Sequence, residues 1–327
     1  MKVLVTGANG LLGHHVVNEL LSDGREIRIL VRNVSDVFFD LHRVEVVLGS
    51  FADASTLDEA LEGCDAVIHI AAMVSHTALD YQPYEAINVD GSIQLFRESI
   101  RMGVKAFVFI SSSNTVGNGT SSSLLANEDY PCGFPFERSY YAQSKIAAES
   151  KLLELSKNQS IRLIIINPCF LIGAFDPKPS SGKLLLMGYK RRIMFVPKGG
   201  KNFVSAENVA RVVCNALEKG RSGERYLAGG ENMSFKNFYT LQSKIGSYQQ
   251  WIIELPDWVL KTAGFIGDFM RAMGMESELS TVNVNQLLVQ EYYTSDKATR
   301  ELALDATDLS KSINQSLCWF KSQGKIS

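Results

Sequence analysis

The sequence predicts an α/β fold, with a doubly wound parallel sheet and a smaller, mainly helical C-terminal part. Short apolar runs alternate with helical patterns through the first half of the chain. These runs are apolar at almost every position, which is typical of parallel strands covered by helices on both faces. After Pro168 the alternation ends, and helical patterns dominate from about residue 230 onward.

Six strands are expected in the first half, with helices between most of them. The strands are Lys2–Thr6, Ile27–Val31, Val44–Leu48, Ala66–Ile70, Ala106–Ile110 and Leu163–Ile166. The helices are His14–Leu21, Ser55–Glu62, Ala86–Met102 and Tyr140–Lys157. In the first helix Val16, Val17 and Leu20 recur at the spacing of one helical face.

A further helix is expected at Pro256–Met273, where the proline suits the first helical turn. Its apolar residues, among them Phe265, Phe269 and Met273, recur at roughly helical spacing. The pattern favours a helix that faces the core of a smaller second domain. A lid over an apolar substrate and a dimer face are the functional alternatives.

Composition excludes several classes of protein. The 327 residues carry a formal charge of −2, which argues against non-specific binding to nucleic acid or to an anionic membrane surface. The five cysteines are scattered without a C-x-x-C pair, so neither a disulfide framework nor a thiolate zinc site is expected, and no metal. We recognise no signal peptide and no apolar run of about 20 residues that could span a bilayer. The sequence therefore predicts a cytoplasmic protein without a membrane partner.

The first strand runs directly into the turn TGANGLLG, which contains Gly7, Gly10 and Gly13. Gly7 can make the tight turn, Gly10 allows backbone to approach a pyrophosphate, and Gly13 allows close packing of helix on strand. The helix that follows offers free N–H groups to phosphates. A glycine turn between a strand and a helix, near the start of an α/β pattern, predicts a Rossmann-like dinucleotide-binding domain.

The residue at the end of the second strand indicates which dinucleotide is bound. An acid there binds the adenosine ribose 2′-OH of NAD, but this chain has Arg32. A guanidinium can bind a 2′-phosphate through two N–H groups, and Asn33 and Ser35 could add hydrogen bonds. The sequence therefore favours NADP(H) over NAD(H). A solvent-facing arginine without a ligand is the alternative.

These patterns divide the chain into two parts. Residues 1–167 are expected to form the NADP-binding domain, and residues 201–229, which contain a turn, a short strand and a helix, are expected to return to it. Residues 168–200 and 230–327 are expected to form the substrate-binding part.

Further motifs follow the glycine turn in a fixed order. DAVIHIAA occupies 65–72, FVFISSSNTVG occupies 107–117 and YAQSK occupies 141–145, with NPCFLIG at 167–173, KNFVSAENVA at 201–210 and SDKATRELAL at 295–304. Together they resemble the extended short-chain dehydrogenase/reductase family, over nearly the whole chain. That group contains sugar-nucleotide epimerases, dihydroflavonol reductase-like enzymes and 3β-hydroxysteroid dehydrogenases.

The resemblance implies a catalytic set of Ser113, Tyr141 and Lys145. Ser50 stands where the family has an aspartate beside the adenine, which puts that contact in doubt. Together with the arginine argument, the resemblance gives these expected cofactor contacts: Gly7, Asn9, Gly10, Leu11, Leu12, Gly13, Arg32, Asn33, Ser50, Phe51, Ala71, Ala72, Met73, Tyr141, Lys145, Pro168 and Phe170.

The spacing of Tyr141 and Lys145 places both side chains on one face of a helix. A phenol with an ordinary pKa of about 10 is a poor base at neutral pH, and a nearby ammonium should lower that pKa. Tyr141 would then exchange a proton with the substrate oxygen, and Ser113 would hydrogen-bond the same oxygen. Tyr140 points away on the helix and is expected to pack or to line the pocket wall.

Other polar residues are assigned more modest roles. His69 ends a buried strand and is expected to be a core histidine with hydrogen-bond partners. Asn88 is expected to support the sheet rather than to transfer a proton, and Ser111 and Ser112 are expected to be structural. His76 lies in the loop after the fourth strand, near the expected pocket.

Departures from the family pattern favour one branch of it. Asn114 and Thr115 stand where sugar-nucleotide dehydratases have acids, and Phe170 stands where epimerases often have a diphosphate-binding asparagine. With Arg32, these residues favour an NADP(H)-dependent oxidoreductase that reduces a ketone or aldehyde to an alcohol. An NAD(P)-dependent sugar or nucleotide-sugar epimerase and a non-catalytic NADP-binding regulator are the alternatives. The expected partner is a small carbonyl or alcohol substrate, and a homodimer is possible on the family pattern.

Overall fold

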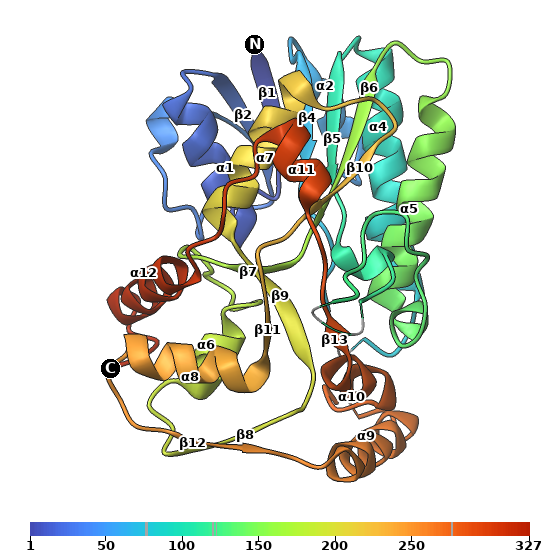
Figure 1. Cartoon of the computed structure of the whole chain (residues 1–327). Coiled ribbons are helices and arrows are strands. Elements are labelled where there is room, and N and C mark those ends of the chain that lie inside the picture. The colour runs from blue at the N-terminus through green and yellow to red at the C-terminus, as the bar shows by residue number, and fades with distance from the viewer. Residues whose placement is uncertain (76–77, 120, 122, 276) are drawn as a thin grey trace.

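The computed structural model describes residues 1–75, 78–119, 121, 123–275 and 277–327. Its central sheet has seven parallel strands in the order β10-β6-β5-β4-β1-β2-β3 (Figure 1). The strands are β1 Lys2–Thr6, β2 Glu26–Val31, β3 Glu45–Leu48, β4 Ala66–His69, β5 Ala106–Ile110, β6 Arg162–Pro168 and β10 Arg225–Ala228. The predicted Rossmann-like fold class is confirmed, and the strand bounds agree with the expected ones within two residues.

Helices cover both faces of this sheet. One face carries α1 Leu11–Ser22, α7 Ala206–Lys219 and α11 Asp296–Leu302, and the other carries α2 Ala54–Leu61, α4 Ser92–Arg101 and α5 Tyr140–Ser156. Successive β1 residues divide between the two cores, with Val3 and Val5 on the α1 side and Leu4 on the α5 side. Each such fully buried side chain contributes about 1.5–3 kcal/mol, which explains why the strands are apolar throughout.

The expected single helix Ala86–Met102 is instead built in three parts. A short α3, Gln82–Tyr84, leads into a π-helical turn, Glu85–Gly91, and then into α4. The wide turn carries Asn88, which bonds to the chain after β4 and to α5. Such turns are rare and often mark functional sites, and a pattern of apolar residues does not reveal them.

The second part of the molecule packs below the carboxyl ends of the central strands (Figure 1). A four-stranded sheet contains β7 Phe170–Ile172, β9 Gly200–Ser205, β11 Glu231–Ser234 and β13 Gln290–Glu291, and a parallel pair contains β8 Ile193–Val196 and β12 Trp251–Glu254. The helices are α6 Lys183–Gly188, α8 Phe235–Ile245, α9 Asp257–Ala272, α10 Thr281–Leu288 and α12 Leu309–Ser322.

The segment 201–229 divides between the two parts. Its helix α7 packs against α1, and its strand β10 pairs with β6 in the central sheet. The strand β9 instead pairs with β7 and β11 in the smaller sheet. The crossing point between the parts is therefore the start of α7.

The helix α9 corrects one expectation. Pro256 is the residue before its first turn, and the apolar face of the helix points outward rather than into the core. Phe265 and Phe269 are 73% and 62% exposed. Gly264 and Gly267 are the buried positions, because they let α9 approach α10 and the chain at Leu279 closely.

Candidate active site

In the glycine turn, Gly7 and Gly13 are closely packed against their neighbours, whereas Gly10 has free space beside it. Gly7 has φ +72°, and a Cβ there would lie 2.7 Å from the Ala71 nitrogen. A Cβ on Gly13 would overlap the Gly7 carbonyl oxygen, so this glycine sets the distance between α1 and β1. A Cβ on Gly10 would meet nothing closer than the Gly7 oxygen at 3.4 Å. The free side of Gly10, at the start of a 12-residue helix with no acid in its first turn, fits a dinucleotide phosphate.

The predicted adenosine contacts lie beside this turn, at the ends of β2 and β3. Arg32 and Asn33 are exposed directly after β2, and no ion pair of Arg32 is found among the described residues. The Asn33 side chain accepts a hydrogen bond from the Ser35 hydroxyl at 2.6 Å. Ser50 closes a local turn by accepting from the Ala52 N–H. The Phe51 ring turns inward against His69, with ring centroids 4.8 Å apart.

The segment after β4 is held by its neighbours. The Ala71 N–H donates to the Thr6 hydroxyl, and the Met73 N–H donates to the Asn88 side chain at 2.7 Å. Asn88 in turn donates to the Ser144 hydroxyl on α5, at 2.9 Å. This supporting role agrees with the prediction for Asn88, and it fixes the chain that follows β4 relative to the Tyr141 helix.

His69 has partners on both ring nitrogens. Its Nδ1 lies 2.7 Å from the Thr6 hydroxyl and its Nε2 lies 2.9 Å from the Ser92 hydroxyl. Burial, and next the charge of Lys145, lower the pKa of His69 to about 3. The ring is therefore neutral at physiological pH, as expected for a core histidine. His76 lies outside the described residues.

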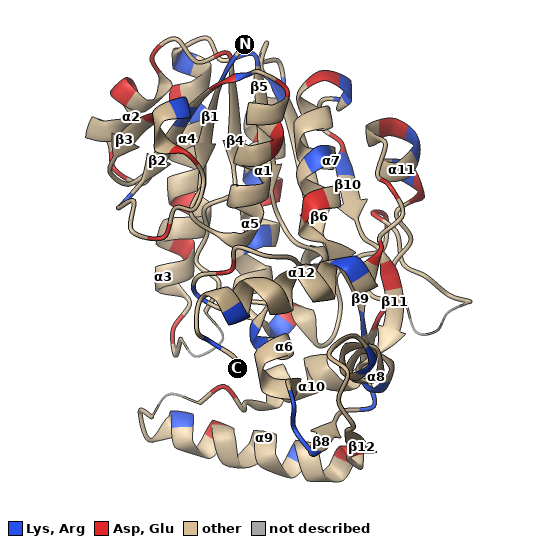
Figure 2. Ribbon diagram, turned by 90° about the vertical axis from the view of Figure 1, so that its left-hand side faces the viewer, with Lys and Arg blue, Asp and Glu red and all other residues tan. Residues whose placement is uncertain are grey.

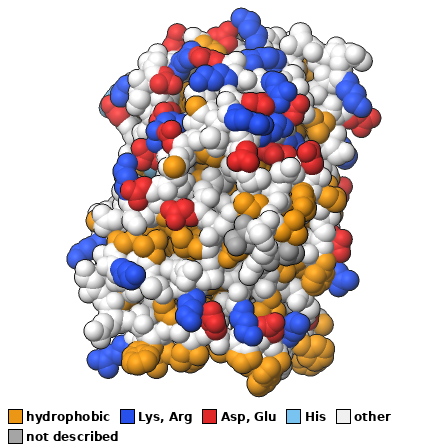
Figure 3. Space-filling view, in the orientation of Figure 1, with side chains coloured by type: hydrophobic (Ala, Val, Ile, Leu, Met, Phe, Trp, Pro, Cys, Tyr) orange, Lys and Arg blue, Asp and Glu red, His pale blue; other side chains and the backbone are white. Residues whose placement is uncertain are grey.

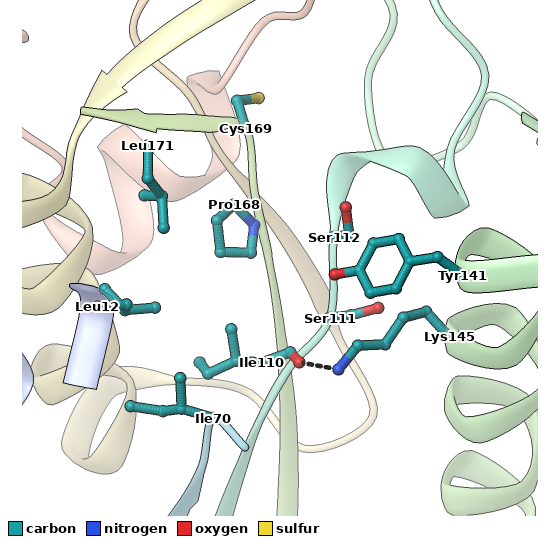
Figure 4. Close-up of a pocket in the computed structure, with 10 residues that line it drawn as sticks. All are labelled: Leu12, Ile70, Ile110, Ser111, Ser112, Tyr141, Lys145, Pro168, Cys169 and Leu171. Carbon is teal, nitrogen blue, oxygen red and sulfur yellow. Dashed lines mark hydrogen bonds between the residues drawn. The ribbon is translucent and has the colours of Figure 1, made fainter. Parts of the chain in front are cut away.

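A pocket opens where these elements meet (Figure 4). Tyr141 and Lys145 reach into it from α5, and Leu12 closes it from α1. Its wall is mostly apolar. The lining residues are Leu12, Ile70, Ile110, Ser111, Ser112, Tyr141, Lys145, Pro168, Cys169 and Leu171.

The structure places Ser112 and Ser113 differently with respect to this pocket. Ser112 lines the pocket beside the Tyr141 phenol, whereas Ser113 is not among the residues that line it (Figure 4). The Ser113 side chain lies near the Cys169 thiol. The reason is the 3-10 turn Ser113–Thr115, which starts directly after Ser112 and ends the alternation of the strand.

Tyr141 and Lys145 share a helical face, but their polar atoms point to different partners. The Lys145 ammonium donates to the Ile110 carbonyl at 2.8 Å and lies 4.7 Å from the centre of the Phe109 ring (Figure 4). Burial lowers the pKa of Lys145 to about 7, against the charge of Glu149. Burial also raises the pKa of Tyr141 to about 12, against the lowering effect of the nearby Ser112 side chain. The expected lowering of the phenol pKa is therefore not found, because desolvation outweighs the other effects.

Two more predicted residues lie away from the pocket. Phe170 packs on Phe203 with ring centroids 5.5 Å apart and contacts the Lys201 ammonium, so its ring belongs to the core of the second part. Its neighbours Cys169 and Leu171 line the pocket instead. Tyr140 packs near Tyr81 and Tyr84, which agrees with the packing role expected for it.

Sequence reasoning did not identify a buried polar cluster behind the serines. Glu149, 4% exposed, accepts hydrogen bonds from Thr115 at 2.9 Å and Asn167 at 2.7 Å, and its second oxygen lies 3.6 Å from Arg225. Asn167 also donates to the Ser112 carbonyl. The cluster therefore fixes the turn that carries Ser112. The spacing of Glu149 four residues after Lys145 is the sequence signal that could have indicated it.

The site carries no sign of metal chemistry in the part of the chain that the structure describes. No group of three or more His, Cys, Asp or Glu side chains is placed there to hold a metal ion. The chemistry available is thus that of the phenol, the hydroxyl groups, the buried ammonium and the glycine turn.

Two curated relatives match nearly the whole chain. The "Sterol demethylase protein B" of Methylococcus capsulatus is 29% identical over 333 residues, which cover 100% of both chains. The "Putative dihydroflavonol 4-reductase" of Synechocystis is 27% identical over 332 residues, which cover 98% of this chain and 95% of the relative. The second name is that of a dihydroflavonol reductase, one of the groups within the family that the sequence motifs resemble.

A solved structure and a family model complete the comparison. The crystal structure of gox2253 superposes with a TM-score of 0.86 and 26% identity, and it covers 100% of this chain and 99% of its own. The model of the NAD dependent epimerase/dehydratase family matches residues 3–229. The chain belongs to that family, the extended short-chain dehydrogenases/reductases, and is an enzyme of their nicotinamide-dependent type.

Proposed function

We propose that this protein is an NADP(H)-dependent oxidoreductase that reduces a ketone or aldehyde to an alcohol. The observation that carries the proposal is the pocket in which the Tyr141 phenol and the Ser112 hydroxyl lie together, beside the glycine turn. Both groups can donate a hydrogen bond to one carbonyl oxygen, as a reductase requires.

The roles of the side chains follow from their positions. Tyr141 is protonated at neutral pH, because burial raises its pKa, and it gives its proton to the oxygen that becomes the alcohol. Ser112 takes the role that the family pattern assigned to Ser113, and it orients the carbonyl oxygen. Lys145 would bind the nicotinamide ribose hydroxyls and carry positive charge near the phenol. The bound nicotinamide would supply the hydride to the carbonyl carbon.

The cofactor preference rests on Arg32. Its guanidinium is exposed at the end of β2, close in the fold to the glycine turn that would hold the pyrophosphate. A 2′-phosphate would give it a bidentate partner, whereas the NAD ribose offers it no anion. We therefore propose NADP(H), with Gly10, Leu11 and Leu12 at the phosphates.

The apolar wall favours a substrate whose carbonyl belongs to an apolar ring system. Leu12, Pro168 and Leu171 line the pocket, and the charged group there is the Lys145 ammonium. The relatives named for sterol and dihydroflavonol chemistry support this substrate class. A nucleotide-sugar, with its diphosphate, would need cations at this wall.

The test is a titration with NADPH followed by a screen of cyclic ketones, with NADPH oxidation as the readout. Tyr141→Phe should lower kcat by at least about 100-fold, because general acid catalysis contributes that much, and should leave NADPH affinity nearly unchanged. Tyr140→Phe is the matched control and should retain activity, since Tyr140 packs on the surface.

The same experiment separates the alternatives. An epimerase would keep its cofactor bound through purification and would interconvert a sugar without net oxidation of NADPH. A regulator would bind NADPH and turn over none of the ketones. Turnover of a ketone by Tyr141→Phe at the wild-type rate would refute the mechanism.

A further inference from the structure

A surface helix of a globular protein turns its large apolar side chains toward the core. In α9 these side chains point outward instead. Its inner face is made of small residues, and Gly264 would place a Cβ only 3.1 Å from the Val284 side chain on α10. Its outer face carries large apolar side chains. They are Trp258, Phe265, Ile266, Phe269 and Met273, each more than half exposed.

The strand pair β8 and β12 continues this apolar surface. Its register sets Trp251 beside Ile193 and Ile253 beside Phe195, so all four side chains share one face of the pair. All four are exposed, and Trp251 is 77% exposed. A two-stranded sheet with no cover on one face is unusual in a water-facing surface.

These residues form one surface, which we call the basal face: Ile193, Phe195, Trp251, Ile253, Trp258, Phe265, Ile266, Phe269 and Met273. Figure 3 shows hydrophobic side chains along the base of the molecule, and Figure 1 places β8, β12 and α9 there. An exposed apolar area that extends over three elements marks an interaction surface.

Cations border the basal face. The stretch 190–198, KRRIMFVPK, holds four basic residues and no acidic one, whereas the whole chain has a net charge of −2. Figure 2 shows this blue stretch leading into β8. Arg191 and Arg192 are exposed, and neither has an ion pair within the described ranges.

The carboxylates at this end are mostly engaged. Asp257 pairs with Lys198 at 3.8 Å, Glu278 pairs with Lys183, and Asp268 accepts from the Thr281 N–H. Glu254, at the end of β12, is exposed without such a partner among the described residues. Arg191, Arg192 and Lys261 have no ion pair in the described ranges and outnumber the two unpaired carboxylates, so the border of the basal face carries a net positive charge.

We propose that the basal face docks on the surface of an anionic phospholipid bilayer. Apolar and tryptophan side chains would enter the boundary between headgroups and acyl chains, while Arg191 and Arg192 would contact lipid phosphates. The protein would lie on the membrane without crossing it, since no helix in the described ranges is long and apolar enough to span one. This departs from the expectation, drawn from the net charge, of no membrane partner, and it does not depend on the proposed reaction.

Charge complementarity favours a bilayer over a second copy of the chain. In a two-fold dimer each basal face would meet itself, so the two clusters of Arg191 and Arg192 would lie at one interface with few carboxylates to neutralise them. Anionic lipid headgroups supply the missing charge, and each nearby cation adds to the attraction.

Vesicle flotation tests the proposal with the full-length protein. Binding is expected to phosphatidylcholine vesicles that contain phosphatidylglycerol, and much less to phosphatidylcholine alone. Phe265→Ser/Phe269→Ser should weaken binding at least about tenfold, through loss of apolar burial. Arg191→Glu/Arg192→Glu should weaken it by a factor on the order of ten or more, and added salt should do likewise.

Matched variants control for solubility and total charge. Val46→Ser/Leu48→Ser removes exposed apolar side chains at β3, and Lys151→Glu/Lys157→Glu reverses two exposed cations on and after α5. Both control proteins should bind vesicles like the wild type. Equal loss in the controls, or no vesicle binding by the wild type, would overturn the proposal.

Tryptophan fluorescence then identifies the surface that is covered. Trp251 and Trp258 belong to the basal face, while the third tryptophan, Trp319, is 8% exposed. Vesicles should shift the emission to the blue, brominated acyl chains should quench it, and Trp251→Phe/Trp258→Phe should abolish both effects. A blue shift that instead grows with protein concentration in the absence of vesicles, with sedimentation as a dimer, would assign the face to a second copy.

Discussion

At the residue scale, the pocket distinguishes two serines that differ by one position. Ser112 lines the pocket beside the Tyr141 phenol, whereas Ser113 lies near Cys169 and is not among the lining residues. The Ser112 Oγ also accepts from the Asn114 N–H at 3.2 Å, so its hydroxyl proton is free to be donated. A hydroxyl that is already oriented loses little freedom when it meets a carbonyl oxygen.

We therefore predict that Ser112→Ala lowers kcat about 10–1,000-fold, as the loss of one donor to the reacting oxygen does. Ser113→Ala should leave kcat within a factor of about three, because its side chain lies outside the pocket. Steady-state kinetics of the two variants on one ketone measures both effects. A larger loss of kcat in Ser113→Ala than in Ser112→Ala would instead assign the catalytic role to Ser113.

Lys145, for which we propose a role in cofactor binding, lowers the stability of the cofactor-free protein. Burial lowers its pKa to about 7, below the ~10.4 of an unfolded lysine. Between these values the unfolded chain binds the additional proton, so the stability of the wild type rises with pH from about 7 to about 10. Below pH 7 the full cost is present.

Lys145→Met should consequently stabilise the cofactor-free protein at pH 6 by about 1–4 kcal/mol while it abolishes turnover. The difference from the wild type should shrink as the pH approaches 10, which denaturant unfolding at several pH values can measure. Lys151→Met, at an exposed position of the same helix, should change stability little. A Lys145→Met protein less stable than the wild type at pH 6 would contradict the prediction.

At the element scale, two glycines of the turn between β1 and α1 have different roles. Gly13 serves the packing of the fold, and Gly10 is expected to serve cofactor binding. Gly13 is needed for the packing of α1 on β1, because a Cβ would overlap the Gly7 carbonyl oxygen. Gly10, with φ −97° and ψ 172°, is in a conformation open to any residue, and its free side faces the expected phosphates.

Gly10→Ala should thus fold with nearly wild-type stability and bind NADPH at least about tenfold more weakly, since the methyl group occupies the phosphate approach. Gly13→Ala should lose more than about 2 kcal/mol of unfolding free energy from strain at α1. Thermal unfolding and a cofactor titration distinguish the two. Normal NADPH binding by Gly10→Ala would place the pyrophosphate elsewhere.

The helix α9 shows what an apolar pattern does and does not specify about an element. The spacing of Phe265, Phe269 and Met273 defines one helical face, and the structure agrees with that grouping. The pattern does not say which way the face points. That direction depends on α10, since Gly264 and Gly267 make the opposite face the one that packs closely.

At the scale of the whole molecule, the expected cofactor contacts come from the ends of several neighbouring strands and from α1 and α5. Binding should therefore stabilise the whole chain. NADPH at 100 times its Kd should raise the unfolding free energy by about 2.7 kcal/mol. Arg32→Asp should reduce this gain with NADPH and preserve or increase it with NADH, because a carboxylate repels the 2′-phosphate. Differential scanning fluorimetry with both cofactors measures the effect.

Arg97→Asp makes the same charge change at an exposed position of α4 and should leave both cofactor responses unchanged. If the wild type is stabilised equally by NADH and NADPH, the proposed cofactor preference fails. That result would leave the proposed role of Tyr141 untouched, since we propose that the phenol acts at the nicotinamide end of the cofactor.

The sequence by itself determined the elements whose cause is local. The runs of β1 and β5 were predicted residue for residue, because a strand covered on both faces must be apolar throughout. The glycine turn was predicted from Gly7 and Gly13, because the tight turn at Gly7 and the close packing of helix on strand at Gly13 both require the absence of a side chain. The family followed from motifs in a fixed order.

Tertiary structure decided the direction in which side chains point where regular structure ends. Ser112 rather than Ser113 lines the pocket because a turn held by Glu149, from a different element, breaks the alternation of the strand. The Phe170 ring points into the second core because it packs there on the Phe203 ring. Burial reversed the expected pKa shift of Tyr141. Each of these depends on contacts between residues far apart in the chain, which spacing along the sequence does not encode.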